Sequence, residues 1–193
     1  YEDKLGSYLV KISGKSLTES DSASVAELLH AIGDFERISD HAVNVLRAAE
    51  EMHNKEISFS PVAVSELSVL AEAIREILDM TVEAFLTSNL TLAARVEPLE
   101  QVIDDLQIEI KANHIQRLQD GRCTIELGFI LSDVLNNYER VSDHCSNIAV
   151  CVIKIMKDAS FDTHAYLSAI KTGSSPQFLR DFETYKQKYT LPA

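Results

Sequence analysis

Glycine and proline are scarce in this chain, with six and four residues among 193. Because glycine and proline interrupt regular elements, their scarcity argues against a fold of many short strands and favours long uninterrupted ones. Hydrophobic residues make up 46% and charged residues 25%, which is ordinary globular composition. The length suffices for one domain, or two small ones, with a sizeable core.

Cysteine is also scarce, and long apolar runs are absent. Cys123, Cys145 and Cys151 form neither a Cys-x-x-Cys motif nor an even-numbered disulfide framework. We therefore predict buried, reduced thiols in an intracellular protein. The sequence contains no signal peptide and no apolar run near the roughly 20 residues of a membrane span, so we expect a soluble chain.

Positive charge is in short supply as well. Lys and Arg number 18 against 30 Asp and Glu, which gives a net charge of −12. This charge repels nucleic acid and anionic membrane surfaces, and it favours the binding of cations. No Gly-rich phosphate loop, nucleophile elbow or Cys/His catalytic pair is present. We therefore expect neither a nucleic-acid partner nor an enzyme.

Helical periodicity dominates the rest of the sequence. Apolar residues recur at three- and four-residue spacing within four long segments, residues 20–53, 61–87, 90–119 and 123–157. The connectors between them are short, which predicts antiparallel neighbours in an all-α bundle. Pro98 should kink the third segment. A short helical stub is predicted within 1–13, and another short helix after Pro176.

One polar pattern occurs twice. Residues 34–45 read Asp-Phe-Glu-Arg-Ile-Ser-Asp-His-Ala-Val-Asn-Val, and residues 137–148 read Asn-Tyr-Glu-Arg-Val-Ser-Asp-His-Cys-Ser-Asn-Ile. At an offset of 103 residues, Glu, Arg, Ser, Asp, His and Asn recur. Packing alone has little reason to repeat polar residues, so the pattern indicates a site built twice with pseudo-symmetry.

The repeat divides the chain into two pseudo-symmetric three-helix units, 1–57 and 58–160, and a tail, 161–193. Residues that would align with 61–103 fall upstream of Tyr1. The first unit should therefore lack its first helix, and we expect the chain to come from a longer protein. The gap should expose an apolar groove that a second copy could cover, which predicts a homodimer.

Three pairs of acidic residues, four positions apart, lie at the edges of apolar stripes. The pairs are Glu36 with Asp40, Glu100 with Asp104, and Glu139 with Asp143. Like charges at this spacing repel by about 0.2–0.5 kcal/mol, so a cation should compensate them. Arg37 and Arg140 could do so in ordinary salt-bridged helix edges. The alternative is a carboxylate-lined metal site, whose oxygen ligands suit Mg²⁺, Ca²⁺, Mn²⁺ or iron.

His41 and His144 directly follow the aspartates, so they point about 100° away from them. We expect them to support a metal ligand, to face a partner or to be exposed, rather than to bind metal. The same expectation covers the other repeated polar residues, Arg37, Asn44, Arg140 and Asn147. Ser39 and Ser142 stand three residues after the glutamates, where di-iron bundles require histidine, so that class is disfavoured.

At these residues the chain resembles the PhoU family, whose repeated helices carry an acidic-x-x-x-Asp motif. The resemblance rests on Leu-Leu-His-Ala-Ile-Gly-Asp-Phe-Glu-Arg-Ile-Ser-Asp-His at 28–41 and Asn-Asn-Tyr-Glu-Arg-Val-Ser-Asp-His-Cys-Ser-Asn-Ile-Ala at 136–149. The stretch Gly-Arg-Cys-Thr-Ile-Glu-Leu-Gly-Phe at 121–129 is similar to the PhoU-like C-terminal domain of bacterial sodium/phosphate cotransporter proteins. Ser39 and Ser142 depart from the glycine that the family often has.

The resemblance implies two three-helix bundles, multinuclear metal sites on acidic faces and regulation of phosphate uptake. It carries the metal-ligand role onto the three acidic pairs named above. It also implies a phosphate transporter as partner, either upstream in the same polypeptide or as a separate protein, and a cytoplasmic location tethered at the inner membrane face. The alternative function is a structural helical interaction or dimerisation domain without metal.

Overall fold

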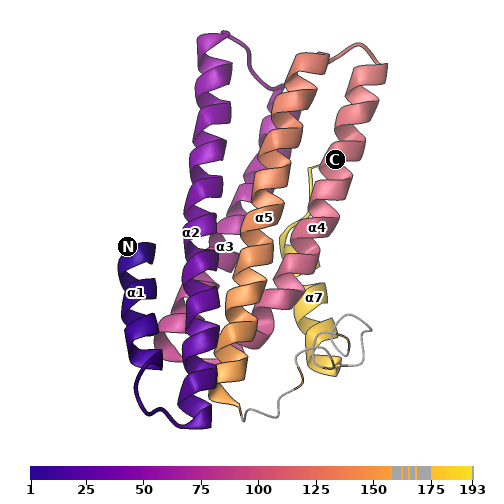
Figure 1. Ribbon diagram of the computed structural model, residues 1–193. Helices are drawn as coiled ribbons and strands as arrows, with labels where there is room; N and C mark the ends of the chain where they lie inside the picture. The colour runs from indigo at the N-terminus through magenta and orange to yellow at the C-terminus, as the bar shows by residue number, and fades with distance from the viewer. Residues whose placement is uncertain (158–161, 163–164, 166–167, 169–174, 193) are drawn as a thin grey trace.

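Figure 1 shows the computed structural model, which describes residues 1–157, 162, 165, 168 and 175–192. All regular structure in these residues is helical, which confirms the predicted fold class. The helices are α1 (Glu2–Ser13), α2 (Glu19–Asn54), α3 (Pro61–Thr87), α4 (Leu90–Gln119), α5 (Ile125–Met156) and α7 (Pro176–Lys188). The predicted segments match these helices closely, including the stub and the tail helix.

Local capping residues explain where the helices begin. Thr18 and Asp21 form a capping box at the start of α2, in which each side chain accepts from the other residue's backbone N–H. The remaining long helices and the tail helix begin after single side-chain caps, supplied by Ser60, Asn89, Thr124 and Ser175. Pro98 lies inside α4, which continues on both sides of it.

The helices form one complete bundle and one partial one (Figure 1). Helices α3, α4 and α5 pack against one another, and α7 packs on α4. The long helix α2 lies beside α5, and the short helix α1 lies along only part of α2. Residues 1–57 therefore contribute one short and one long helix, whereas residues 58–157 contribute three long helices. Among the described residues, no helix is both long and apolar enough to cross a bilayer.

The hydrophobic core lies mainly in the complete bundle. Its fully inaccessible side chains include Leu70, Ile77, Leu99, Ile103, Ile110, Leu131, Leu135 and Ile148. By contrast, α1 buries no residue and α2 buries only Val25, Ala31 and Ala48. Cys145 and Cys151 are buried free thiols, as predicted, whereas Cys123 is free but only half-buried. Burial raises the pKa of Cys145 to about 12.

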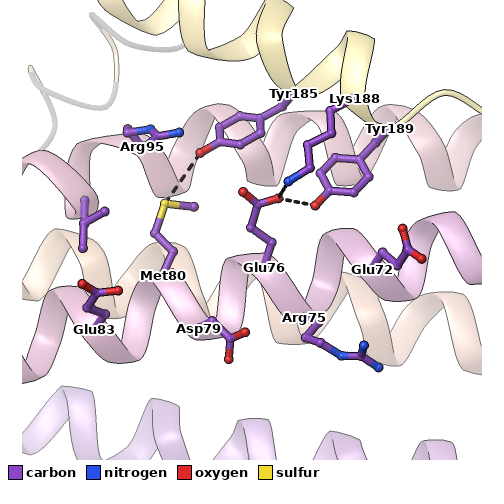
Figure 2. Close-up of a pocket in the computed structure, with 11 residues that line it drawn as sticks. Glu72, Arg75, Glu76, Asp79, Met80, Glu83, Arg95, Tyr185, Lys188 and Tyr189 are labelled. Atoms are coloured by element: carbon purple, nitrogen blue, oxygen red, sulfur yellow. Dashed lines mark hydrogen bonds and ion pairs between the residues drawn. The ribbon is translucent and has the colours of Figure 1, made fainter.

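The tail helix α7 is held to α3 by aromatic and charged side chains (Figure 2). Tyr185 is 2% exposed and its hydroxyl donates to the Met80 sulfur at 3.7 Å. Lys188 lies 2.7 Å from the Glu76 carboxylate, which also accepts from the Tyr189 hydroxyl. Burial acts to raise the pKa of Glu76, but these two donors outweigh it and the pKa is lowered.

Gly128 at the start of α5 is required by a close contact with α4. A Cβ at this position would lie 2.8 Å from Nε2 of His114, a side chain that is buried. We expect Gly128→Ala to lower the free energy of unfolding by about 1–3 kcal/mol. The matched control is Gly33→Ala, where the new Cβ meets nothing within 4 Å. This variant should raise the free energy of unfolding by about 0.5–1 kcal/mol, because alanine is the better helix former. Urea titrations that found both variants equally stable would contradict the contact.

Candidate functional site

The two copies of the repeated motif face each other across α2 and α5, which run antiparallel. Lys55 at the end of α2 pairs with Glu126 at the start of α5 at 2.7 Å. Lys154 near the end of α5 pairs with Glu27 near the start of α2 at 2.9 Å. These two ion pairs show the register of the two helices, and the motifs meet midway between them. We call this α2–α5 contact, centred on His41 and His144, the seam.

One half of the seam is built around the amide oxygen of Asn137. Nδ1 of His41 lies 2.8 Å from Oδ1 of Asn137. The side chain of Asn44 donates to the same oxygen at 3.1 Å. A histidine and an asparagine of α2, one helical turn apart on a single face, therefore share one acceptor on α5.

The other half repeats the same arrangement with the helices exchanged. Nδ1 of His144 lies 2.7 Å from Oδ1 of Asp34, and Asn147 donates to that oxygen at 3.3 Å. The rings of His41 and His144 stack with their centroids 5.6 Å apart and an interplanar angle of 26°. Each contact has its counterpart 103 residues away, so the seam has a pseudo-twofold axis that passes between the two rings.

The seam shows what the sequence analysis missed. Asp34 and Asn137 begin the two repeated segments, but no role was predicted for them. The signal was available, because they occupy equivalent positions and both present a side-chain oxygen. Four of the residues that were expected to support a metal ligand or to face a partner instead contact the other motif helix through hydrogen bonds. These residues are His41, Asn44, His144 and Asn147.

The seam makes a testable contribution to stability. We expect Asp34→Ala to lower the free energy of unfolding by about 1–3 kcal/mol, because it removes the acceptor of two hydrogen bonds and leaves their partners unsatisfied. Asp34→Asn should change it by less than about 1 kcal/mol, because Asn137 already serves as the acceptor in the other half. Equal losses for both variants in urea unfolding would mean that charge, not the acceptor geometry, matters at Asp34.

Two of the acidic pairs lie level with each other on neighbouring helices. At one point Ser146 of α5 donates to the buried Glu97 of α4 at 2.5 Å. Farther along, the amide of Gln107, in the orientation that satisfies both its groups, bonds the Leu135 carbonyl and the Glu139 N–H of α5, each at 3.2 Å. The acidic pairs lie between these two contacts along α4 and α5. Counting residues from each contact places Glu100 at the same height along the helices as Asp143, and Asp104 at the same height as Glu139.

The surroundings of these carboxylates differ from those of a formed metal centre. Glu100 is 8% exposed, Asp104 and Glu139 are half-buried, and Asp143 pairs with Arg140 at 3.6 Å. Within the described ranges, no three or more His, Cys, Asp or Glu side chains are grouped so as to hold a metal ion. The oxygen donors have the chemistry that a hard cation prefers, but their present arrangement does not fit one.

The first acidic pair lies in a different environment. Glu36 and Asp40 line a pocket of about 400 Å³ between α1 and α2, together with Tyr1 and Leu5. No residue of α1 matches Glu100 or Asp104 across this pocket by the 103-residue offset. Arg37 is exposed and lines a separate groove of about 540 Å³ along the seam. The structure therefore does not bring the first pair together with the other two.

Comparison with known proteins agrees with this architecture. Residues 67–152 match the family model of the PhoU domain. The chain is 24% identical over 150 residues to the phosphate-specific transport system accessory protein PhoU homolog 1 of Thermotoga maritima, covering 78% of this chain and 63% of that protein. It is 25% identical over 141 residues to the corresponding PhoU homolog of Zymomonas mobilis, covering 73% and 58%.

A solved structure shares the fold. The crystal structure of PhoU from Pseudomonas aeruginosa superposes with a TM-score of 0.73 at 23% identity, covering 80% of this chain and 73% of that one. The chain spans less than two thirds of the length of the two curated relatives. The domain match over the α3–α5 bundle, the two relatives and the shared fold all concern PhoU proteins, and they support the resemblance of this chain to the PhoU family.

Proposed function

We propose that this chain is a regulatory domain of phosphate transport. The observation that carries the proposal is the PhoU domain match, which covers most of the α3–α5 bundle. The names of the two curated relatives support it, since both are called accessory proteins of a phosphate-specific transport system. The partner would be a phosphate transporter, either separate or encoded upstream as in sodium/phosphate cotransporter proteins. The domain would then act in the cytoplasm at the inner membrane face.

The second part of the proposal is that a hard cation, such as iron, Mn²⁺, Mg²⁺ or Ca²⁺, binds between α4 and α5. The level placement of Glu100 with Asp143 and of Asp104 with Glu139 supports this, as does the net charge of −12. Side chains would have to turn toward one another, because the described residues contain no ready group of three donors. Glu36 and Asp40 would form an incomplete counterpart.

Metal binding is tested by neutralising the α5 pair. We expect Glu139→Gln with Asp143→Asn to lose bound Mn²⁺ or Fe³⁺ in elemental analysis and calorimetric titration. It should also lose the metal-dependent stabilisation, which amounts to about 2.7 kcal/mol when free metal is 100 times its Kd. The control variant Glu50→Gln with Glu183→Gln removes the same charge from exposed positions on α2 and α7 and should bind as the parent does. Equal binding by both variants would rule out the α5 pair.

The regulatory role is tested in cells that express the full-length protein. Glu36, Asp40, Glu139 and Asp143 are neutralised together while expression is held constant, and phosphate uptake is measured over a range of external phosphate. We expect uptake and its response to phosphate to change. Unchanged uptake would argue against a regulatory role for these carboxylates. Uptake that changes although metal binding is intact would separate the regulatory proposal from the metal proposal.

A second candidate is a helical interaction or dimerisation domain without metal. The seam favours it, because contact between α2 and α5 gives the repeated His and Asn residues a purely structural use. This alternative leaves the repeated Glu and Asp without a use. If this alternative is correct, the variants with neutralised carboxylates should have the same oligomeric state, metal content and phosphate uptake as the parent protein.

A further inference from the structure

A pocket of about 370 Å³ lies between α3, α4 and α7, and one charged side chain in it has a buried donor without a partner. The lining includes Met80 and Glu83 of α3, Leu92 and Arg95 of α4, and Tyr185 of α7. Nε of Arg95 is inaccessible to solvent and has no hydrogen-bond partner. A buried donor on a charged group is costly to leave unsatisfied, so this atom needs an acceptor that a ligand could supply.

The guanidinium of Arg95 is oriented by an aromatic ring but is not neutralised. It lies over the ring of Tyr185, 5.6 Å from the ring centre. Tyr185 is itself fixed, because it is 2% exposed and its hydroxyl donates to the Met80 sulfur. In the part of the chain that the structure describes, Arg95 forms no ion pair. Glu76 lines the same pocket, but two donors of α7 already occupy its carboxylate.

Glu83 supplies the opposite charge in the same pocket. Its side chain is exposed and, within the described ranges, forms no ion pair. Figure 2 shows Glu83, Met80 and Arg95 at one end of the pocket, away from Lys188. Met80 and Leu92 add apolar surface to the lining. The pocket therefore presents a cation, an anion and an apolar surface, and the two charges are not paired with each other.

We propose that this pocket binds a small zwitterion of the α-amino acid type with an apolar side chain. The ligand carboxylate accepts from Arg95, whose planar N–H groups match two carboxylate oxygens. The ligand ammonium lies toward Glu83, and the ligand side chain covers Met80 and Leu92. A ligand that carries only negative charge is disfavoured, because the lining has four carboxylates against three basic side chains. The volume of about 370 Å³ lies in the range of small-molecule sites.

Calorimetric titration of the protein with leucine and two of its analogues tests the proposal. Leucine carries both charges, 4-methylpentanoate lacks the amine, and 3-methylbutylamine lacks the carboxylate. We expect leucine to bind with a Kd of about 1 mM or lower. Each analogue should bind at least about tenfold more weakly, because each loses one contact between charged groups. Leucine should also raise the melting temperature as it fills the site.

Three variants locate the binding. Arg95→Lys keeps the positive charge but removes Nε and the planar donor group, so it should weaken leucine binding at least about tenfold. Glu83→Gln should weaken the binding of leucine but not that of 4-methylpentanoate. Arg75→Lys is the matched control, because Arg75 lines the same pocket but points away from α7 in Figure 2, and it should bind leucine as the parent does. Melting temperatures measured without leucine establish that each variant is folded.

Three outcomes would overturn the proposal. They are no saturable binding of leucine, equal binding of leucine and 4-methylpentanoate, and equal binding of leucine by the parent and Arg95→Lys. The second outcome would assign the pocket to a simple carboxylate, and the third would place leucine elsewhere on the protein. None of them bears on metal binding between α4 and α5, because no carboxylate of that proposed site lines this pocket.

Discussion

Replacing Arg117 with methionine should lower the free energy of unfolding by about 3–5 kcal/mol. The guanidinium of Arg117 on α4 donates to both carboxylate oxygens of Glu66 on α3, at 2.9 and 2.8 Å. Arg117 is 8% and Glu66 1% exposed. Without the arginine, the Glu66 carboxylate remains buried with Asn113 as its donor at 2.9 Å, and an uncompensated buried charge is strongly unfavourable.

Two further variants separate this explanation from a general loss of packing. The double variant Glu66→Leu with Arg117→Met should recover most of the lost stability, because apolar residues often replace a buried ion pair without loss. Lys186→Met breaks an exposed pair with Asp105, whose atoms lie 3.4 Å apart, and should lower stability by less than about 1 kcal/mol. Urea unfolding measures all three. If Arg117→Met lost no more than Lys186→Met, the buried pair would not be what ties α3 to α4.

Alanine at two equivalent positions of the repeat should have unequal effects. Leu135 on α5 is 0% exposed, so Leu135→Ala should lower the free energy of unfolding by about 2–5 kcal/mol through lost burial and a new cavity. Ile32, its counterpart on α2, is only half-buried and borders a pocket. Ile32→Ala should lower it by less than about 1.5 kcal/mol, because less apolar surface returns to water.

Each variant is the control for the other, since both truncate a branched aliphatic side chain at the same repeat position. The measurement is urea unfolding of residues 1–193, with the slope compared to confirm that both variants unfold in the same way. Equal losses would mean that the first unit has a core as complete as the second.

The helices were predictable because their signals are local. Three- and four-residue apolar spacing and the connectors around Pro61 and Asn89 indicated the bounds of α3 and α4, and the structure has the same bounds. The tail helix was predictable from the apolar spacing of Phe178 and Tyr185. Its docking on Met80 and Glu76 was not, because those residues lie about a hundred positions away and nothing local connects them.

The seam was predictable only in part. The 103-residue offset identified the repeated His and Asn residues, but not the acceptors Asp34 and Asn137 across the interface. An antiparallel register pairs residues that are far apart in the chain, and that register depends on the packing of the whole α2–α5 contact. The buried ion pair of Glu66 and Arg117 was missed for the same reason, since each alone is an ordinary charged residue on a helix.

The sequence by itself determined the helices and the repeat, because periodicity acts within one segment and the repeat is found by comparing two segments. The tertiary structure decided which repeated side chains meet, which carboxylates lie level on α4 and α5, and which copy of the motif is buried. Ser39 and Ser142 illustrate the division. Their sequence surroundings are nearly the same, yet Ser142 is 0% exposed and Ser39 is on the surface. Burial depends on the neighbouring helices, and α5 has two covering its stripe where α2 has only part of one.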